Sequence, residues 1–126
     1  MATRRTRGRA VATRAARSTA DFDRDATLAN LREIYIKLDW ADTHALTPAE
    51  QDKWFRQYTT TRHAIVRLEQ SELADINARL GAEAGALAAA IQACEAALHG
   101  AQETAQIVAS VGVALSAIEQ LVLLLA

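Results

Sequence analysis

The residues of this chain best suited to bind a metal ion are its three histidines and the acids beside them. Asp39, Asp42 and His44 lie close together, and carboxylate and imidazole groups both bind divalent metals. They also lie where a helix is expected to end, and a capped helix end explains them without an ion. Neither His63 nor His99 completes a spacing typical of a metal site. We therefore predict no metal-binding residue.

Glu95 and His99 are separated by one helical turn. Di-iron helical bundles use a shorter Glu-x-x-His spacing and use it twice, so we interpret this pair as ordinary support of a helix. Cys94 is the single cysteine, which excludes an intramolecular disulfide and a cysteine-based zinc site. No Lys or Arg follows Arg79 to stabilise a thiolate, so we expect a buried thiol with an apolar role.

The glycines Gly81, Gly85 and Gly100 form no phosphate-binding loop, because their spacing is wrong and no strand is predicted before them. A Ser-His-Asp arrangement cannot be argued from predicted helices alone. We therefore expect a protein that is not an enzyme, with no catalytic residues, no cofactor and no small-molecule substrate.

The elements that would position any site are predicted to be helices. Apolar residues make up 51% of the chain and aromatic residues only 5%, so most apolar residues are Ala, Leu, Ile and Val. Ala and Leu favour helices. One proline and five glycines are too few for the many turns of a sandwich or barrel. The predicted fold class is all-α, and 126 residues suit one domain.

Charge is distributed unevenly, although the net charge is only −1. Residues 1–18 lack acids and apolar periodicity and are predicted to form a disordered arm. Its six arginines are Arg4, Arg5, Arg7, Arg9, Arg14 and Arg17. The arm allows three interpretations, namely a solvated tail, a contact with nucleic acid or another anionic surface, and an organelle-targeting segment. No apolar stretch follows it, which argues against a secretory signal peptide and favours a cytoplasmic location.

Two helix starts are predicted in the first half of the chain. Ser18 or Thr19 would cap a first helix over residues 20–41, along which apolar residues recur at helical spacing. The second start, at residue 48, has the stronger signal. The sequence Thr47-Pro48-Ala49-Glu50 combines an N-cap hydroxyl, a proline at the first helical position and a glutamate three residues after the cap.

Three aromatic residues lie in the first turns of this second helix. Trp54 and Tyr58 share a helical face with Ile65, and we expect this face to anchor the first helix. Phe55 falls on another face. We favour core packing for these aromatic residues, and the alternative is that Phe55 is an exposed aromatic of a binding patch.

No proline interrupts the chain after residue 48, so we predict one helix over residues 48–99, about 75 Å long. Its internal glycines would each weaken it by about 1 kcal/mol relative to alanine and would let another backbone approach. Its apolar seam follows the seven-residue repeat of coiled coils. The leucines of this repeat are Leu73, Leu80 and Leu87.

Gly100 is expected to end the long helix, because glycine is preferred just past a helix C-terminus. A last helix would then run over residues 101–125 and fold back on the Ala-rich stretch 82–97. The alternative is one unbroken helix to the C-terminus. The predicted architecture is a long helical hairpin or three-helix bundle with coiled-coil-like packing, forming one domain over residues 19–126.

The segment 105–126 is apolar or small on every side, apart from Glu119 and Gln120. Such a helix must be covered on every side. A second copy of the chain, another helical protein or lipid would cover it. Its length and the small pair Gly112 and Ser116 suit a membrane helix. Against lipid, Glu119 would cost about 2.5 to 3.5 kcal/mol near the bilayer centre, and flanking Lys or Arg anchors are missing.

Three function classes follow from these surfaces. We favour a non-enzymatic module that forms homo-oligomers, or binds another helical protein, through helix packing. The residues expected to carry this packing are Leu73, Leu80, Leu87, Ile91, Ile107, Val111, Leu115, Ile118, Leu121 and Leu125. The alternatives are a membrane-active or membrane-anchored protein that uses the last helix, and a nucleic-acid-associated protein that uses the basic arm.

Overall fold

A computed structural model describes residues 22–126, and every regular element in this part of the chain is helical. The all-α prediction is confirmed for these residues. In chain order the elements are α2 (Arg24–Asp39), the 3₁₀ turn η1 (Thr43–Ala45), α3 (Pro48–Gln70), α4 (Leu73–Leu80), the 3₁₀ turn η2 (Gly81–Glu83), α5 (Ala84–Leu98) and α6 (Thr104–Leu124). The predicted disordered arm, its arginines and the cap at Ser18 or Thr19 lie outside the described residues, so the contacts expected of the arm stay predictions.

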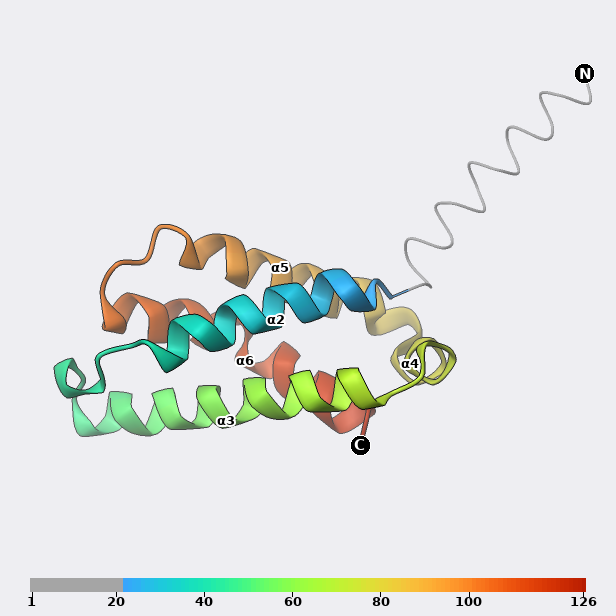
Figure 1. Cartoon of the computed structure of the whole chain (residues 1–126), viewed down its shortest axis with the longest axis horizontal. Helices are drawn as coiled ribbons and strands as arrows, with labels where there is room; N and C mark the ends of the chain where they lie inside the picture. The colour runs from blue at the N-terminus through green and yellow to red at the C-terminus, as the bar shows by residue number, and fades with distance from the viewer. Residues whose placement is uncertain (1–21) are drawn as a thin grey trace, which may run out of the picture.

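The four helices α2, α3, α5 and α6 pack side by side (Figure 1). One antiparallel pair is formed by α2 and α3, and the other by α5 and α6. Since α2 also packs on α5, and α3 on α6, each helix has two close neighbours. The short α4 connects the two pairs at one end of the molecule (Figure 1). This arrangement places α6 between α3 on one side and α5 on the other.

The prediction of one helix over residues 48–99 is wrong, because the chain is broken twice within that range. The first break follows α3, where Ser71 and Glu72 are both extended, with ψ of 140° and 146°. Arg24 donates hydrogen bonds to the carbonyl oxygens of Glu69 and Ser71, at 2.9 and 3.2 Å. These bonds satisfy acceptors that a continuous helix would have satisfied internally.

The second break is at Gly81, where a φ of 52° and a ψ of −130° end α4. Among residues 22–126, it has the only positive φ. Glycine adopts this conformation readily, whereas a residue with a side chain would be strained. The glycine expected to weaken a continuous helix is therefore the residue that turns the chain. With the break after α3, it allows α5 to pack against α2, so four helices form the core instead of three.

The predicted start of α3 is confirmed. The Thr47 hydroxyl accepts a hydrogen bond from the backbone N–H of Glu50 at 3.2 Å, and the Glu50 carboxylate accepts one from the backbone N–H of Thr47 at 3.0 Å. Pro48 occupies the first turn. The hydrogen bond from the Thr47 backbone favours the charged carboxylate and lowers the pKa of Glu50.

The other helix ends differ from prediction by a few residues. Helix α2 begins at Arg24, with the Asp23 side chain as its cap, instead of at residue 20, and it ends at Asp39 instead of residue 41. The predicted break at Gly100 is confirmed, because α5 ends before it. Helix α6 then begins at Thr104 and not at residue 101.

The apolar core lies between the four long helices and receives side chains from each of them. Its largest fully buried apolar side chains are Leu31, Ile34, Leu38, Leu68, Ile76, Ile91, Leu98, Val111, Ile118 and Leu121. On α2, α5 and α6 these residues recur at helical spacing and form an apolar stripe that faces inward, whereas the inward side of α3 also carries the polar side chains of Gln57 and Thr61. The outer faces stay available to solvent or a partner.

Candidate helix-docking surface

Most of the residues predicted to carry helix packing lie inside the chain's own core. Leu115 is half-buried, and Leu73 on α4 is 50% exposed. The buried members of the set are Leu80, Leu87, Ile91, Ile107, Val111, Ile118, Leu121 and Leu125. Their role in assembly stays a prediction. A surface for a partner must instead be sought on the outward faces of the same helices.

Helix α6 is only partly covered by its own chain, and the expectation that a second copy, another protein or lipid covers the rest stays a prediction. It is the one described helix long and apolar enough to cross a membrane by length and composition, and 33% of that apolar stretch is buried. Its exposed residues, which we term the outer face of α6, are Ala105, Gln106, Ala109, Gly112, Val113, Ser116, Gln120 and Leu123. Val113 is 87% exposed and Leu123 is 74% exposed. The surfaces on either side of this outer face differ in character.

On one side, a hollow of about 260 Å³ lies between α5 and α6. Its lining is mostly apolar and consists of Ala90, Ala93, Cys94, Ala97, Ser110, Val113 and Ala114. Helix α5 extends this surface with exposed alanines spaced alternately three and four residues apart, as in a coiled-coil seam. These alanines are Ala86, Ala89, Ala93 and Ala96. The hollow and these alanines together form the α5–α6 face, and neither helix contains a Lys or Arg.

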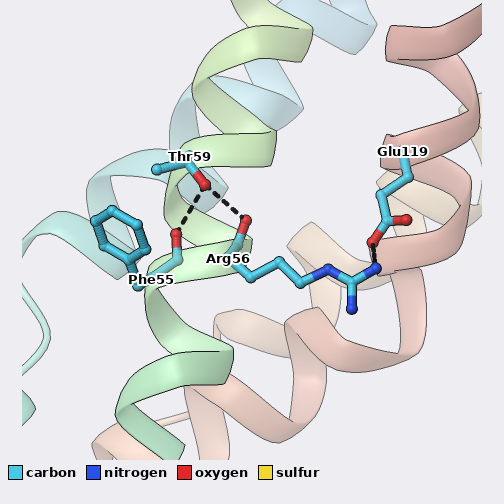
Figure 2. A network of polar contacts seen from close by, with 4 residues as sticks. All are labelled: Phe55, Arg56, Thr59 and Glu119. Carbon is cyan, nitrogen blue, oxygen red and sulfur yellow. Dashed lines mark hydrogen bonds and ion pairs between the residues drawn. The ribbon is translucent and has the colours of Figure 1, made fainter.

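On the other side, two hollows lie along the seam between α3 and α6, and together they form the α3–α6 groove. The larger, about 600 Å³, is lined by Thr59, Arg62, His63, Val66, Arg67, Gln70 and Val122. The smaller, about 410 Å³, is lined by Glu50, Lys53, Arg56, Gln57, Ala105, Val108, Ala109, Gly112 and Leu115. Arg56 Nη2 donates to Glu119 Oε1 at 2.7 Å and joins α3 to α6 (Figure 2).

The seam between α3 and α6 contains polar groups that are buried. Gln57 is 2% exposed, and its Nε2 donates to the carbonyl oxygen of Val108 at 2.8 Å. Gln57 Oε1 and the hydroxyl of Thr61 are buried without a hydrogen-bond partner among the described residues. A buried acceptor without a hydrogen-bond partner is costly, so these polar groups make the α3–α6 seam less stable than a purely apolar contact would be.

The α3 wall of the groove is basic. Lys53, Arg56, His63 and Arg67 are exposed and follow one stripe of the helix. Among the described residues, Arg56 pairs with Glu119, whereas Lys53 and Arg67 have no ion-pair partner. Along the smaller hollow this stripe, with Glu50 at its start, faces an apolar wall of mostly small residues on α6, whereas Val122 is the α6 residue that lines the larger hollow.

The residues first considered for chemistry have structural roles. Cys94 is 5% exposed, as predicted, and burial followed by the nearby charge of Glu95 raises the pKa of its thiol to about 11. Such a thiol is protonated at neutral pH and is a poor nucleophile. His99 pairs with Glu95 across one turn, and Asp42 caps a turn by accepting from the backbone N–H of His44 at 3.1 Å. Within residues 22–126, no three His, Cys, Asp or Glu side chains are grouped to hold a metal ion.

The predicted aromatic anchor between α2 and α3 is present. The ring of Tyr58 stacks on those of Tyr35 and Trp54, with centroid separations of 4.9 and 5.1 Å. Trp54 Nε1 donates to the carbonyl oxygen of Leu38 at 2.8 Å. The Tyr58 hydroxyl lies 2.8 Å from that of Tyr35 and donates to Asp39 at 2.9 Å. These contacts join the first pair of helices.

Sequence reasoning placed Phe55 correctly on another face but missed the basic stripe of α3. Phe55 is 61% exposed and points away from the side of α3 that carries Arg56 (Figure 2). The signal for the stripe was its spacing, since its basic residues recur on one helical face. Their position beside α6 depends on the fold.

Two unlike surfaces on either side of α6 are thus the candidate site. Comparison of the chain with protein-family models, with curated proteins and with solved structures gives no match. The functional conclusion therefore depends on the geometry of these surfaces alone.

Proposed function

We propose that this chain is a non-enzymatic helical interaction module that self-associates through its α5–α6 face. One observation carries the proposal. Val113, the most exposed of the large apolar side chains in the described residues, lies beside a hollow lined almost entirely by small side chains. Exposed apolar surface of this kind typically marks an interaction site.

A second copy is the occupant that this geometry favours. In a two-fold interface each surface meets itself, so a protruding side chain must lie next to the hollow that receives it. The Val113 side chain of each copy would enter the hollow of the other, between Ala93 and Ala97. Small side chains on both helices would let the backbones approach closely, which strengthens van der Waals contact.

Charge on this face also permits self-association. The acids nearest to it have partners within the chain, since Glu95 pairs with His99 and Glu119 with Arg56. Two copies would therefore meet without strong repulsion. Helix α5 has 15 residues. At about 1.5 Å per residue, and with a face roughly 20 Å wide, the contact would bury on the order of 450 Å² per copy, so we expect a weak, concentration-dependent dimer.

Light-scattering mass after size exclusion, at low and at high protein concentration, tests the proposal. The wild-type chain should shift from monomer towards dimer as concentration rises. Val113→Asp should remain monomeric, because it places a charge on the α5–α6 face without disturbing the core. Ile36→Asp is the matched control, since Ile36 is 44% exposed on α2, and it should dimerise like the wild type. A wild-type chain that is monomeric at every concentration would contradict the proposal.

A membrane-active protein is the second candidate, and the limited burial of α6 supports it. Insertion would require α6 to leave α3, breaking the Arg56–Glu119 ion pair and the hydrogen bond from Gln57 to Val108. Glu119 would then cost about 2.5 to 3.5 kcal/mol near the bilayer centre, which is why we rank this function second. Leakage from lipid vesicles that disappears on removal of residues 105–126 would support it. Leakage that survives this deletion, or no leakage by the whole chain, would dismiss it.

A further inference from the structure

The α3–α6 groove has the length to receive a helix. Its lining runs from Glu50 to Gln70 on α3, about 30 Å at the rise of an α-helix. Arg56, which lines the smaller hollow, reaches across the seam to Glu119 and joins the two helices (Figure 2). The side chains of this ion pair are 65% and 33% exposed. Because exposed ion pairs add little stability, an occupant can displace this one at small cost.

The two walls of the groove indicate what kind of helix fits. On α6 the wall begins with Ala105, Ala109 and Gly112, whose small size lets another backbone approach. On α3 the wall carries Lys53 at one end and Arg67 at the other, neither in an ion pair with a described residue. An amphipathic helix with an apolar face towards α6 and an acidic edge towards α3 complements both walls.

A buried polar group at the base of the groove provides a second, independent observation. Gln57 lines the smaller hollow, and its buried Oε1 has no hydrogen-bond partner among residues 22–126. Gly112 lies directly beside it, since a Cβ on this glycine would come within 3.5 Å of Gln57 Nε2. The missing side chain leaves space beside the amide nitrogen, which donates to Val108. A hydroxyl or amide donor on an occupant would supply the partner that Oε1 lacks once the Gln57 side chain turns towards the hollow, because Oε1 has no exposed surface in the free chain.

We infer that the α3–α6 groove binds an amphipathic helix of a partner protein, with acidic residues along one edge, small apolar residues on its face and a hydrogen-bond donor opposite Gln57. This inference goes beyond self-association, because the α3–α6 groove and the hollow of the α5–α6 face share no lining residue. A protein with both surfaces would link a dimer to a second component.

Fluorescent synthetic peptides of about 20 residues, the length of the groove, test this inference on the whole chain. One peptide has an alanine and leucine stripe, a central serine and glutamates along one edge. A second peptide replaces the glutamates by lysines. By fluorescence anisotropy, the glutamate peptide should bind, with an affinity that falls as salt is added, whereas the lysine peptide should not bind. Absence of binding by the glutamate peptide would overturn the inference.

Variants of the protein locate the peptide. Lys53→Glu and Arg67→Glu, at opposite ends of the groove, should each weaken binding about tenfold or more, because each reverses a charge that faces the acidic edge. Ala109→Leu should weaken it by filling the apolar wall without a change in charge. The control Lys37→Glu reverses a charge on α2 and should leave binding unchanged. Circular dichroism should show that all four variants remain helical.

The outcomes separate this inference from the proposed self-association. The Val113→Asp variant should no longer dimerise but should still bind the glutamate peptide. If it loses both properties, the peptide binds to the α5–α6 face and the inference is overturned. If Lys37→Glu weakens peptide binding as much as Lys53→Glu does, the peptide is attracted by the overall charge of the protein and not by the groove. This result would also overturn the inference. If Lys53→Glu lowers the oligomer mass while no peptide binds, the groove belongs to a second copy and the inference is wrong.

Discussion

The two antiparallel helix pairs of this protein are held together by different means. Between α2 and α3, three aromatic rings stack, and their polar atoms donate to partners such as Asp39 and the backbone of Leu38. Between α5 and α6, the contact consists mainly of small and aliphatic side chains, with a weak, long contact of 3.7 Å between Cys94 Sγ and the carbonyl oxygen of Ser110.

This difference explains where the available surfaces lie. Stacked rings and directional hydrogen bonds fill the seam between α2 and α3, so few groups there remain to contact a partner. Alanine-rich helices can approach closely, but each buries one narrow stripe and leaves an apolar surface outside. The α5–α6 face therefore lies on the second pair, whereas the α3–α6 groove lies between the two pairs. The difference can be tested by comparing the inner and outer faces of the second pair and by comparing the second pair with the first.

The largest expected effect separates the two faces of α5. Ile91 is fully buried, so Ile91→Ala should lower the free energy of unfolding by about 2 to 5 kcal/mol, through lost apolar burial and the cavity left behind. Ala89→Ser on the exposed face should change it by less than about 0.5 kcal/mol. Urea denaturation at low protein concentration measures both. Similar losses for the two variants would show that the outer face is already buried.

A matched pair of glycines distinguishes the turn before α5 from α5 itself. Nothing lies within 4 Å of a Cβ added at Gly81 or Gly85, so their responses depend on backbone conformation alone. Gly81→Ala should destabilise the chain by about 1 to 2 kcal/mol, because its φ is positive. Gly85→Ala should stabilise it by up to about 1 kcal/mol, because alanine favours a helix. Thermal unfolding would reveal opposite signs, and equal signs would argue against the turn at Gly81.

The hydrogen bonds between α2 and α3 should contribute less to the free energy of unfolding. Tyr58→Phe removes the hydroxyl shared with Tyr35 and the donor to Asp39, and should lower the free energy of unfolding by about 1 kcal/mol. Tyr35→Phe removes one of these bonds and should cost less. Both variants keep the stacked rings, so chemical denaturation isolates the polar contribution. A Tyr58→Phe variant as stable as the wild type would show that the seam depends on stacking alone.

The last expected effect is a loss of stability at alkaline pH, and it begins at different pH in the two pairs. Burial raises the pKa of Cys94 from 9.0 to about 11, so the folded chain keeps this proton longer than the unfolded chain. Stability should therefore decline as pH rises from about 9 to about 11. The hydrogen bond with Tyr35, followed by that with Asp39, raises the pKa of Tyr58, so its contribution should be lost only above about pH 10.

Denaturation curves at several pH values would test this order. In Cys94→Ala the decline should begin nearer pH 10, because only the tyrosine contribution remains. An unchanged onset in this variant would show that Cys94 does not contribute to the pH dependence.

Local features of the sequence predicted much of the fold and part of the site. The capping box at Thr47, the break at Gly100, the burial of Cys94 and the aromatic anchor were all predicted and are present. The α3–α6 groove was not predicted, because its two walls come from helices about 50 residues apart, and the spacing within α3 does not show which helix lies beside its basic stripe.

The sequence by itself determined the helical class, the start of α3 and the inward stripe of each helix, since these depend on residue propensities and spacing within a few turns. Only the tertiary structure decided where the long predicted helix breaks and which side of α6 stays exposed. Arg24 satisfies carbonyl groups 45 and 47 residues away in the chain, so the first break depends on a distant contact. The exposure of α6 depends on how many helices pack around it, and periodicity along a single helix does not determine that number.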